Sequence, residues 1–255
     1  MKKIIFLIFI TILTIGTKSI FCQNNYQTII DSANKYYSDA KYEKAINLYN
    51  SIIDKGFESA ELYYNIGNAY FKSEDIANAI LYFEKAKKIK PNDEDINYNL
   101  EVANSRISDK IEEIPELFFV KWWKNIKNLY CVDTWAKISV FTISFFFVLA
   151  LVYFMSKNNL MRKFSFFSGI ILIILFAISL NFSIKKYKST INQNEGIIFT
   201  PSITVKSSPN KNSVDLFVVH EGTKIKVIDE LGEWVEIKIA NGSVGWLKKE
   251  NLKMI

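Results

Sequence analysis

The chain has 255 residues, a formal net charge of +6 and one histidine. Residues 117–193 carry ten Lys or Arg against Asp133 alone, whereas residues 24–116 are acidic overall and residues 195–255 are balanced. The positive excess therefore belongs to a hydrophobic middle and a short N-terminal stretch, where it suits lipid headgroups, and no globular segment shows the basic stripe of a nucleic-acid-binding protein. We expect no nucleic-acid partner. Two cysteines also exclude a disulfide framework.

Residues 1–22 have the features of an export signal. Lys2 and Lys3 precede an apolar run, and a short polar region follows it. Cleavage after Cys22 is the expected processing, although Ile20 is bulkier than such sites usually accept. A retained anchor would give the same sidedness. Lipidation of Cys22 is a further alternative, but it needs small residues before the cysteine.

Two stretches of the chain superimpose at a shift of 34 residues, which is the period of a helix-pair solenoid. In residues 60–93 the signature positions are Tyr63, Gly67, Tyr70, Ala79, Phe83, Ala86 and Pro91. The earlier copy has Ala33, Tyr36, Ala45, Tyr49, Ile52 and Phe57 opposite the last six of these. Both copies resemble the tetratricopeptide repeat. This implies a short α-solenoid over residues 24–108 that ends in a capping helix; an ordinary helical hairpin is the alternative.

One face of the first helix in each copy is the predicted partner-binding groove. Its residues are Asn34 and Tyr37 in the first copy, and Tyr64, Asn68 and Phe71 in the second. The latter three lie on one helical stripe at i, i+4 and i+7. Tetratricopeptide proteins that clamp a carboxylate add Lys or Arg to such asparagines, and these are absent here. We therefore expect an extended peptide held by asparagine amides and aromatic contacts. Alternatively, Tyr64 and Phe71 only pack against neighbouring helices.

Residues 117–134 mix lysines with large aromatic side chains. Lys121, Lys124 and Lys127 are interleaved with Phe118, Phe119, Trp122, Trp123 and Tyr130. This mixture is typical of a segment that lies at a membrane surface, because the rings sit at the interface while the ammonium groups reach the headgroups. We expect an interfacial amphipathic segment; an ordinary amphipathic linker is the alternative.

Two uncharged apolar runs predict a transmembrane helical hairpin. They lie within residues 137–156 and 164–184 and are 19 and 21 residues long. Each would span about 30 Å as a helix, the thickness of a bilayer core. If the signal exports the repeats, the loop 157–163 is cytoplasmic and both soluble domains are periplasmic. Lysines flank both sides of the hairpin, so a cytoplasmic repeat domain stays open as an alternative.

Residues 194–255 change to short β-branched alternations. The expected strands include residues 203–205, 216–219, 224–228 and 234–239, with turns at Gly222, Gly232, Gly242 and Gly245. The segments Val205-Lys-Ser-Ser-Pro209, Glu221-Gly222 and Gly245-Trp246-Leu247, with Trp234, resemble the bacterial SH3 domain. The resemblance implies a small SH3-like β-barrel that holds cell-wall peptide or a protein partner and performs no chemistry.

Catalytic, metal and cofactor sites are not expected. A thiol hydrolase needs a cysteine activated by a base, and the only candidates, Cys131 and His220, lie in different predicted segments. One histidine and one usable cysteine cannot complete a tetrahedral metal site. The acidic clusters 93–95 and 112–116 are expected to be solvated surface, the first of them at a helix start.

The order of these parts resembles the BatE family of the Bacteroides aerotolerance operons. The resemblance implies an envelope protein that works with the other operon products, which are membrane proteins with von Willebrand A domains. The expected fold is multidomain: an α-solenoid, a membrane hairpin and a small β-barrel. The expected function is a multi-pass scaffold of the inner membrane that binds protein partners. A wall-binding sensor or anchor with peptidoglycan as ligand is the alternative, and an enzyme that uses Cys131 or His220 is a third hypothesis.

Overall fold

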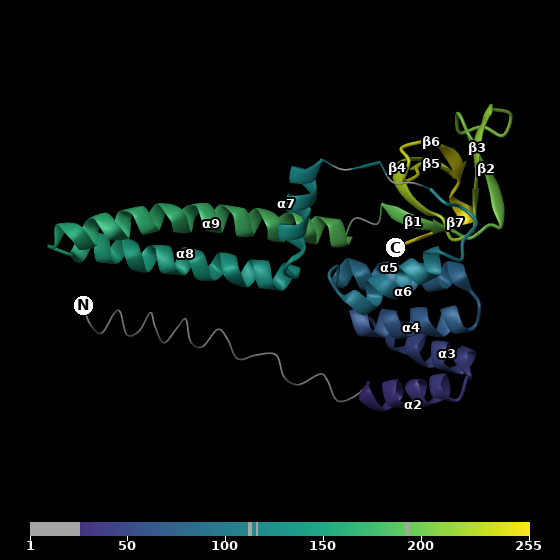
Figure 1. Cartoon of the computed structure of the whole chain (residues 1–255), viewed down its shortest axis with the longest axis horizontal. Coiled ribbons are helices and arrows are strands. Elements are labelled where there is room, and N and C mark those ends of the chain that lie inside the picture. The colour runs from purple at the N-terminus through teal and green to yellow at the C-terminus, as the bar shows by residue number, and fades with distance from the viewer. Residues whose placement is uncertain (1–25, 112–113, 116, 192–193) are drawn as a thin grey trace. The chain divides into compact units, whose positions relative to one another are not determined.

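The computed structural model describes residues 26–111, 114–115, 117–191 and 194–255. The chain divides into two compact units, Met1–Glu58 and Ser59–Ile255 (Figure 1). The expected export signal and the acidic residues Glu112, Glu113 and Glu116 lie outside the described residues.

In the first unit, α2 (Gln27–Ser38) and α3 (Tyr42–Ile53) form a helical hairpin. Ala33 and Ala45 have no exposed surface, and these small side chains allow the two helices to approach closely. Tyr49 is also buried and fills the space beside them. The rings of Tyr26 and Phe57 lie 5.2 Å apart, so the two ends of the hairpin contact each other. The weaker copy of the repeat therefore has its own small core.

The second unit begins with α4 (Ala60–Lys72), α5 (Ile76–Ile89) and α6 (Glu94–Asn104). Each helix starts at a capping side chain that accepts an N–H bond: Ser59 from Leu62 at 3.1 Å, Asp75 from Asn78 at 3.1 Å and Asp93 from Ile96 at 3.2 Å. A side chain at Gly67 would place its Cβ 2.6 Å from the ring of Phe83, so only glycine fits without a shift of that ring. The expected capping helix is α6.

The turn between the two helices of a repeat has the same backbone in both copies. Ala40 and Glu74, which are 34 residues apart, are the two non-glycine residues with positive φ among the described residues, at 58° and 66°. The next amide closes the turn in both cases, with Lys41 donating to the Tyr36 carbonyl at 2.8 Å and Asp75 donating to the Tyr70 carbonyl at 3.0 Å. The helix pairs therefore repeat at the expected period.

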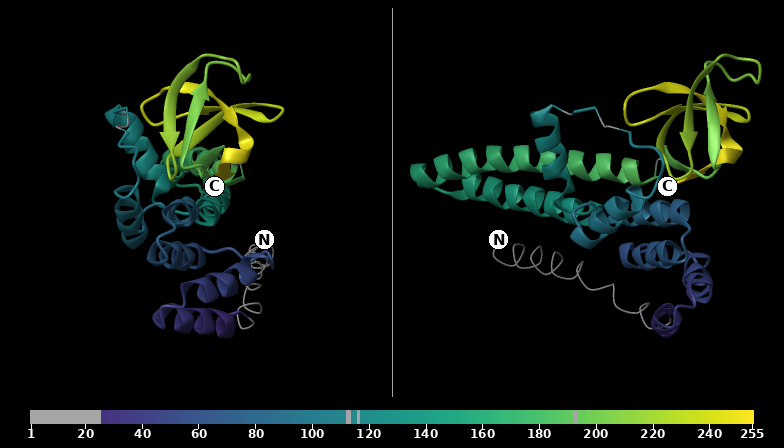
Figure 2. Two further views of the ribbon diagram at one scale, coloured as in Figure 1. Left: turned by 90° about the vertical axis from the view of Figure 1, so that its right-hand side faces the viewer. Right: turned by 45° about the vertical axis from the view of Figure 1, so that its right-hand side comes forward.

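Three helices follow: α7 (Phe118–Asn128), α8 (Val132–Met155) and α9 (Asn159–Ile191). Both α8 and α9 are long and apolar enough to cross a membrane. They lie side by side as an antiparallel pair (Figures 1 and 2). Large apolar side chains point outward, with Phe154 82% and Phe164 70% exposed, so these helices are not the core of a soluble domain. The segment expected as the loop 157–163 is helical from Asn159 onward, which leaves a connection of only three residues.

An aromatic cluster fixes α7 to the base of this helix pair. The ring of Phe182 in α9 lies 4.9 Å from Trp123 in α7 and 5.0 Å from Trp135 in α8. The Trp135 indole N–H donates to the Lys127 carbonyl at 2.9 Å. The expected interfacial segment is therefore a helix packed against the hairpin, followed by the first turn of α8.

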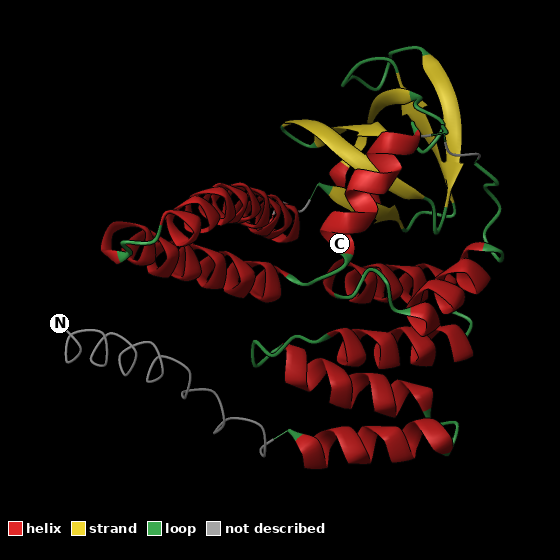
Figure 3. Ribbon diagram, turned by 60° about the vertical axis from the view of Figure 1, so that its left-hand side comes forward, coloured by secondary structure: helices red, strands yellow, loops and turns green. Residues whose placement is uncertain are grey.

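The C-terminal part is an antiparallel sheet of the expected SH3-like type, shown in yellow in Figure 3. Its strands are β1 (Glu195–Ile198), β2 (Ser202–Lys206), β3 (Asp215–His220), β4 (Lys224–Leu231), β5 (Trp234–Lys238), β6 (Val244–Lys248) and β7 (Leu252–Met254), with a 3-10 turn η1 (Lys249–Asn251) before the last strand. The strand order is β3-β2-β6-β5-β4-β1-β7. Alternate residues such as Ile225 and Val227, or Val235 and Ile237, are buried, as the β-branched alternation predicts.

Three of the four glycines expected at turns are correctly placed. Gly222, Gly232 and Gly242 have φ of +85°, +61° and +91°. The prediction for Gly245 is wrong, because this residue lies inside β6. A Cβ there would lie 2.6 Å from the Val205 side chain and 2.8 Å from the Lys206 carbonyl oxygen. Gly245 is required by the close approach of β2 to β6, and not by a turn.

The sheet shares a hydrophobic core with the repeat helices of the same unit. Buried members of this core are Ala79, Ile80, Leu81 and Phe83 of α5, Leu100 and Ala103 of α6, Ile197 of β1, and Ile255. Gly222 belongs to the same contact, since a Cβ at this position would lie 2.4 Å from Ile107. Residues 59–111 and the sheet are therefore packed against each other and are not separate domains joined by a linker.

Candidate partner-binding site

In the second repeat, the predicted groove residues lie beside α6. The Asn99 amide N–H₂ group donates to the Tyr64 hydroxyl at 2.9 Å and to Asn68 Oδ1 at 2.8 Å. The Arg106 guanidinium lies 5.7 Å from the centre of the Phe71 ring, within cation–π range. All three groove side chains are half-buried. The structure thus places Tyr64, Asn68 and Phe71 on one face. Through Asn99, α6 contacts Tyr64 and Asn68, so part of this face packs against a neighbouring helix, as the alternative prediction states.

In the first repeat, the Tyr49 hydroxyl donates to Asn34 Oδ1 at 2.5 Å. Burial, with a smaller contribution from Tyr37, raises the pKa of Tyr49 to about 12, so this hydroxyl stays protonated and remains a donor at neutral pH. The Tyr37 ring contacts Tyr42 edge-on at 5.6 Å. Asn34 itself is exposed.

Both asparagines accept a hydrogen bond at Oδ1, although from different elements. Tyr49 of the same repeat donates to Asn34, and Asn99 of the capping helix α6 donates to Asn68, so the N–H₂ end of each asparagine has a fixed direction. No described residue accepts a hydrogen bond from either N–H₂ group. Such a group supplies two N–H donors, which are the complement of a peptide carbonyl. A partner-binding role for the five groove residues stays a prediction.

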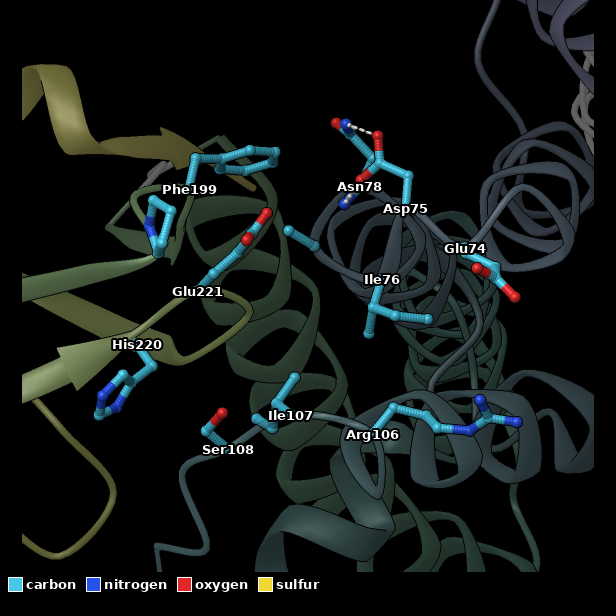
Figure 4. Close-up of a pocket in the computed structure, with 12 residues that line it drawn as sticks. Glu74, Asp75, Ile76, Asn78, Arg106, Ile107, Ser108, Phe199, His220 and Glu221 are labelled. Atoms are coloured by element: carbon cyan, nitrogen blue, oxygen red, sulfur yellow. Dashed lines mark hydrogen bonds between the residues drawn. The ribbon is translucent and has the colours of Figure 1, made fainter.

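A separate pocket of about 470 Å³ lies where the repeat helices meet the sheet (Figure 4). Asp75 and Arg106 line it on the helical side, and Phe199 and Glu221 line it on the sheet side. Figure 4 shows Asp75 bonded to Asn78 at the start of α5. A ligand in this pocket would contact both kinds of domain at once.

Asp109, in the segment after α6, ties that segment to the sheet. Its carboxylate accepts the His220 backbone N–H at 2.8 Å and the Thr223 hydroxyl at 2.6 Å, and it lies 2.6 Å from His220 Nδ1. Burial alone would raise the pKa of Asp109, but these hydrogen bonds outweigh it and lower the pKa. His220 is therefore a junction residue, a role that sequence reasoning missed.

Lys224 forms a second link. Its ammonium group lies 2.9 Å from Glu84 of α5 and 3.0 Å from Glu195 of β1. Burial would lower the pKa of Lys224, but the two carboxylates outweigh this effect and raise it. The strand pattern around Lys224 predicts only its place in β4, since its helical partner is 140 residues away in sequence.

The residues considered for catalysis have other partners. Cys131 is exposed and lies 3.1 Å from the Thr134 hydroxyl, whereas His220 is bound to Asp109. Within the described ranges, no three His, Cys, Asp or Glu side chains lie close enough to hold a metal ion. Asp93 caps α6, and Glu94 and Asp95 follow in its first turn, which confirms the expected helix start.

Comparison with known families identifies two segments. Residues 60–93 match the tetratricopeptide repeat and residues 201–253 match the bacterial SH3 domain. Both are typically binding modules without catalytic activity, the first for proteins and the second for cell-wall material. A search of curated proteins finds no match to the chain. The protein thus combines a tetratricopeptide repeat and a bacterial SH3 domain with two helices that could span a membrane.

Proposed function

We propose that this protein is a membrane-anchored scaffold that binds protein partners through its tetratricopeptide repeats. The observation that carries the proposal is the recurrence of a fixed asparagine, Asn34 and Asn68, whose N–H₂ group is oriented by a donor to its own Oδ1. A preoriented donor loses little entropy when it binds a peptide carbonyl. The proposed ligand is an extended peptide, with Tyr37, Tyr64 and Phe71 as its aromatic contacts.

Crosslinking in intact membranes, followed by purification, tests the scaffold. Wild type should capture one or a few defined proteins. Each hydrogen bond contributes about 1 kcal/mol, so changing both Asn34 and Asn68 to Ala should weaken capture roughly thirtyfold. Asn47→Ala is the control, because Asn47 is an exposed asparagine of α3 outside the groove. Unchanged capture by the double variant would contradict the proposal.

We further propose that α8 and α9 cross the inner membrane and that the signal in residues 1–22 places both soluble domains in the periplasm. The 24 residues of α8 span about 36 Å, enough for a bilayer core. Because only three residues connect the helices, Cys131 lies near one end of the pair and Asn158 at the other. The repeats and the sheet must then emerge on the same side.

Thiol labelling with a membrane-impermeant maleimide tests this topology. Cys131 is exposed and should react in cells whose outer membrane alone has been opened. In a variant with Cys22→Ser and Cys131→Ser that carries Asn158→Cys as its single cysteine, labelling should occur only after the inner membrane is lysed. The reverse pattern would place the repeats in the cytoplasm.

A second candidate function is attachment to the cell wall through residues 201–253, which match the bacterial SH3 domain. The test is sedimentation of the detergent-solubilised full chain with purified peptidoglycan. The full chain is needed because a fragment starting at residue 194 would expose Ile197 and Ile255, which are buried against α5 and α6. Co-sedimentation that soluble wall peptides abolish would support a wall anchor.

The resemblance to the BatE family suggests which proteins the scaffold serves. We propose that its partners are membrane proteins with von Willebrand A domains, acting together in tolerance of oxygen or envelope stress. Mass spectrometry of the crosslinked material should identify them. If the captured proteins include none with a von Willebrand A domain, the proposed aerotolerance role would be contradicted while the proposed scaffold function would stand.

A further inference from the structure

The groove of the second repeat has a cationic neighbour that belongs to neither repeat. Arg106 follows Ser105, the C-cap of α6, and its guanidinium lies 5.7 Å from the centre of the Phe71 ring. Phe71 is one of the predicted groove residues and lies three positions after Asn68 on α4. The five predicted groove residues themselves carry no charge. Arg106 therefore adds a positive charge to a set of neutral side chains.

The charge of Arg106 is not cancelled by any residue that the structure describes. Within those residues, no carboxylate forms an ion pair with its guanidinium, and its side chain donates no hydrogen bond. The contact with the Phe71 ring attracts the cation but leaves its net charge unchanged. Arg106 is also exposed, so its N–H donors are open to an incoming anion.

The acidic side chains around Arg106 are engaged elsewhere or lie apart from it. Asp75 caps α5 and accepts two hydrogen bonds, at 3.1 and 2.7 Å. Asp109 is bound to the sheet by three contacts of 2.6 to 2.8 Å. Glu74 and Glu221 line the same pocket as Arg106, but neither forms an ion pair with it. Figure 4 shows the Arg106 side chain pointing away from Glu221.

The backbone on both sides of Arg106 is fixed. The Arg106 N–H donates to the Ala103 carbonyl, in the last turn of α6, at 3.0 Å. The next residue, Ile107, packs against the core that the helices share with the sheet. Arg106 is therefore held beside Phe71 before a ligand binds, and binding does not have to order this part of the backbone.

We propose that the groove of the second repeat selects extended peptides that carry an acidic side chain, Asp or Glu, and that Arg106 binds this carboxylate. The inference rests on the proposed function and deepens it, because it names the class of peptide that the scaffold takes. A guanidinium offers two parallel N–H donors to one carboxylate. The Asn68 amide then binds a peptide carbonyl, and Arg106 binds the acid at a neighbouring position of the same peptide.

The carboxylate is assigned to a side chain and not to the end of a peptide. Arg106 contacts Phe71 on one side and lines the pocket of about 470 Å³ beside the sheet on the other. A peptide that passes Arg106 can therefore continue into this pocket.

Selection from a library of random dodecapeptides on the detergent-solubilised full chain tests the inference. Half of the library has a free C-terminus and half has a blocked one. Peptides recovered with the wild type should contain Asp or Glu at a preferred position, with either kind of C-terminus. Fluorescence anisotropy then compares each recovered peptide with a version in which the acid is replaced by its amide. The wild type should bind the acidic version about tenfold more tightly, and Arg106→Gln should lose this preference.

Two further variants serve as controls. Arg106→Lys keeps the charge but loses the paired donors, so it should keep a preference of about threefold; it also carries the test if Arg106→Gln fails to fold by circular dichroism. Lys211→Gln removes one charge from an exposed loop of the sheet and should keep the full preference. Equal binding of acid and amide by the wild type, or an unchanged preference in Arg106→Gln, overturns the inference. So does an equal loss of preference in Lys211→Gln, or recovery only of peptides with a free C-terminus.

Failure of this inference is distinguishable from failure of the proposed function. The double variant Asn34→Ala and Asn68→Ala should weaken the acidic and the amide peptide to the same extent, because the amides bind backbone carbonyls. Weakening by this double variant without any effect of Arg106→Gln overturns only the role of Arg106. A library from which the wild type recovers no peptide overturns both.

Discussion

At the scale of single residues, the junction between repeat and sheet depends on a few polar contacts that the local sequence does not predict. Asp109 bonds with His220 and Thr223, 111 and 114 residues away. No periodicity marks it, because it lies in an irregular segment after α6. The turn glycines were predictable because positive φ is a local requirement, whereas the close approach that explains Gly245 depends on a distant strand.

Changing Asp109 to Asn should destabilise the second unit by about 1.5–3 kcal/mol at neutral pH, because charge-assisted hydrogen bonds are lost. The folded pKa of Asp109 is lowered from its ordinary 3.8, so its contribution is complete above that value and is lost as pH falls through the folded pKa. Urea unfolding of the purified protein at pH 7 and at successively lower pH values below 3.8 measures this, and the stability difference between variant and wild type should shrink as the pH falls. Asp229→Asn, at an exposed site of β4, is the control and should change stability by less than about 0.5 kcal/mol.

Glu74 has a φ of 66°, a conformation that costs a residue with a Cβ about 1 kcal/mol. Glu74→Gly should therefore raise the free energy of unfolding by about 0.5–1 kcal/mol. Glu101→Gly makes the same exchange in the interior of α6 and should lower stability by about 1 kcal/mol. Thermal unfolding of the two variants compares them, and a loss of stability in both would contradict the assigned turn.

At the scale of elements, the contact between α4 and α5 depends on a missing side chain. Gly67→Ala would place a Cβ 2.6 Å from the buried Phe83 ring, and we expect a loss of about 1–3 kcal/mol. Combining it with Phe83→Leu should recover part of that loss, because the smaller side chain makes room. A double-mutant cycle by urea unfolding measures the coupling. Strict additivity would show that the ring does not set the helix separation.

The helices were the most predictable elements, since both the repeat signature and the apolar runs are local patterns. Their ends were less so. The helix α9 begins within the segment expected as a loop and continues past the apolar run to Ile191, because lysines at a helix end interrupt hydrophobicity without interrupting backbone hydrogen bonds. The contact of α6 with Tyr64 and Asn68 could not be predicted from the sequence, because the repeat signature does not specify which face of the preceding helices a capping helix covers.

At the scale of the molecule, the second unit contains a hydrophobic core inside the sheet and a second core that the sheet shares with α5 and α6. Ile80 of α5 belongs to the core that also contains Ile197 of β1, whereas Ile66 of α4 lies outside it; both have no exposed surface. Ile80→Ala and Ile66→Ala should each cost about 2–5 kcal/mol. Only Ile80→Ala should also reduce the amide protection of β1 and β7 in hydrogen exchange. Equal loss of strand protection in both variants would contradict a shared core.

The matching turns at Ala40 and Glu74 also bear on how such a protein could be lengthened. Residues 41–74 begin just after the left-handed residue Ala40 and end on the equivalent left-handed residue Glu74, so the two ends of this segment have the same backbone geometry. A tandem duplication of residues 41–74 would insert two helices and would reuse the turn that is already present. A change in the number of repeats is therefore compatible with the turn geometry already present in this backbone.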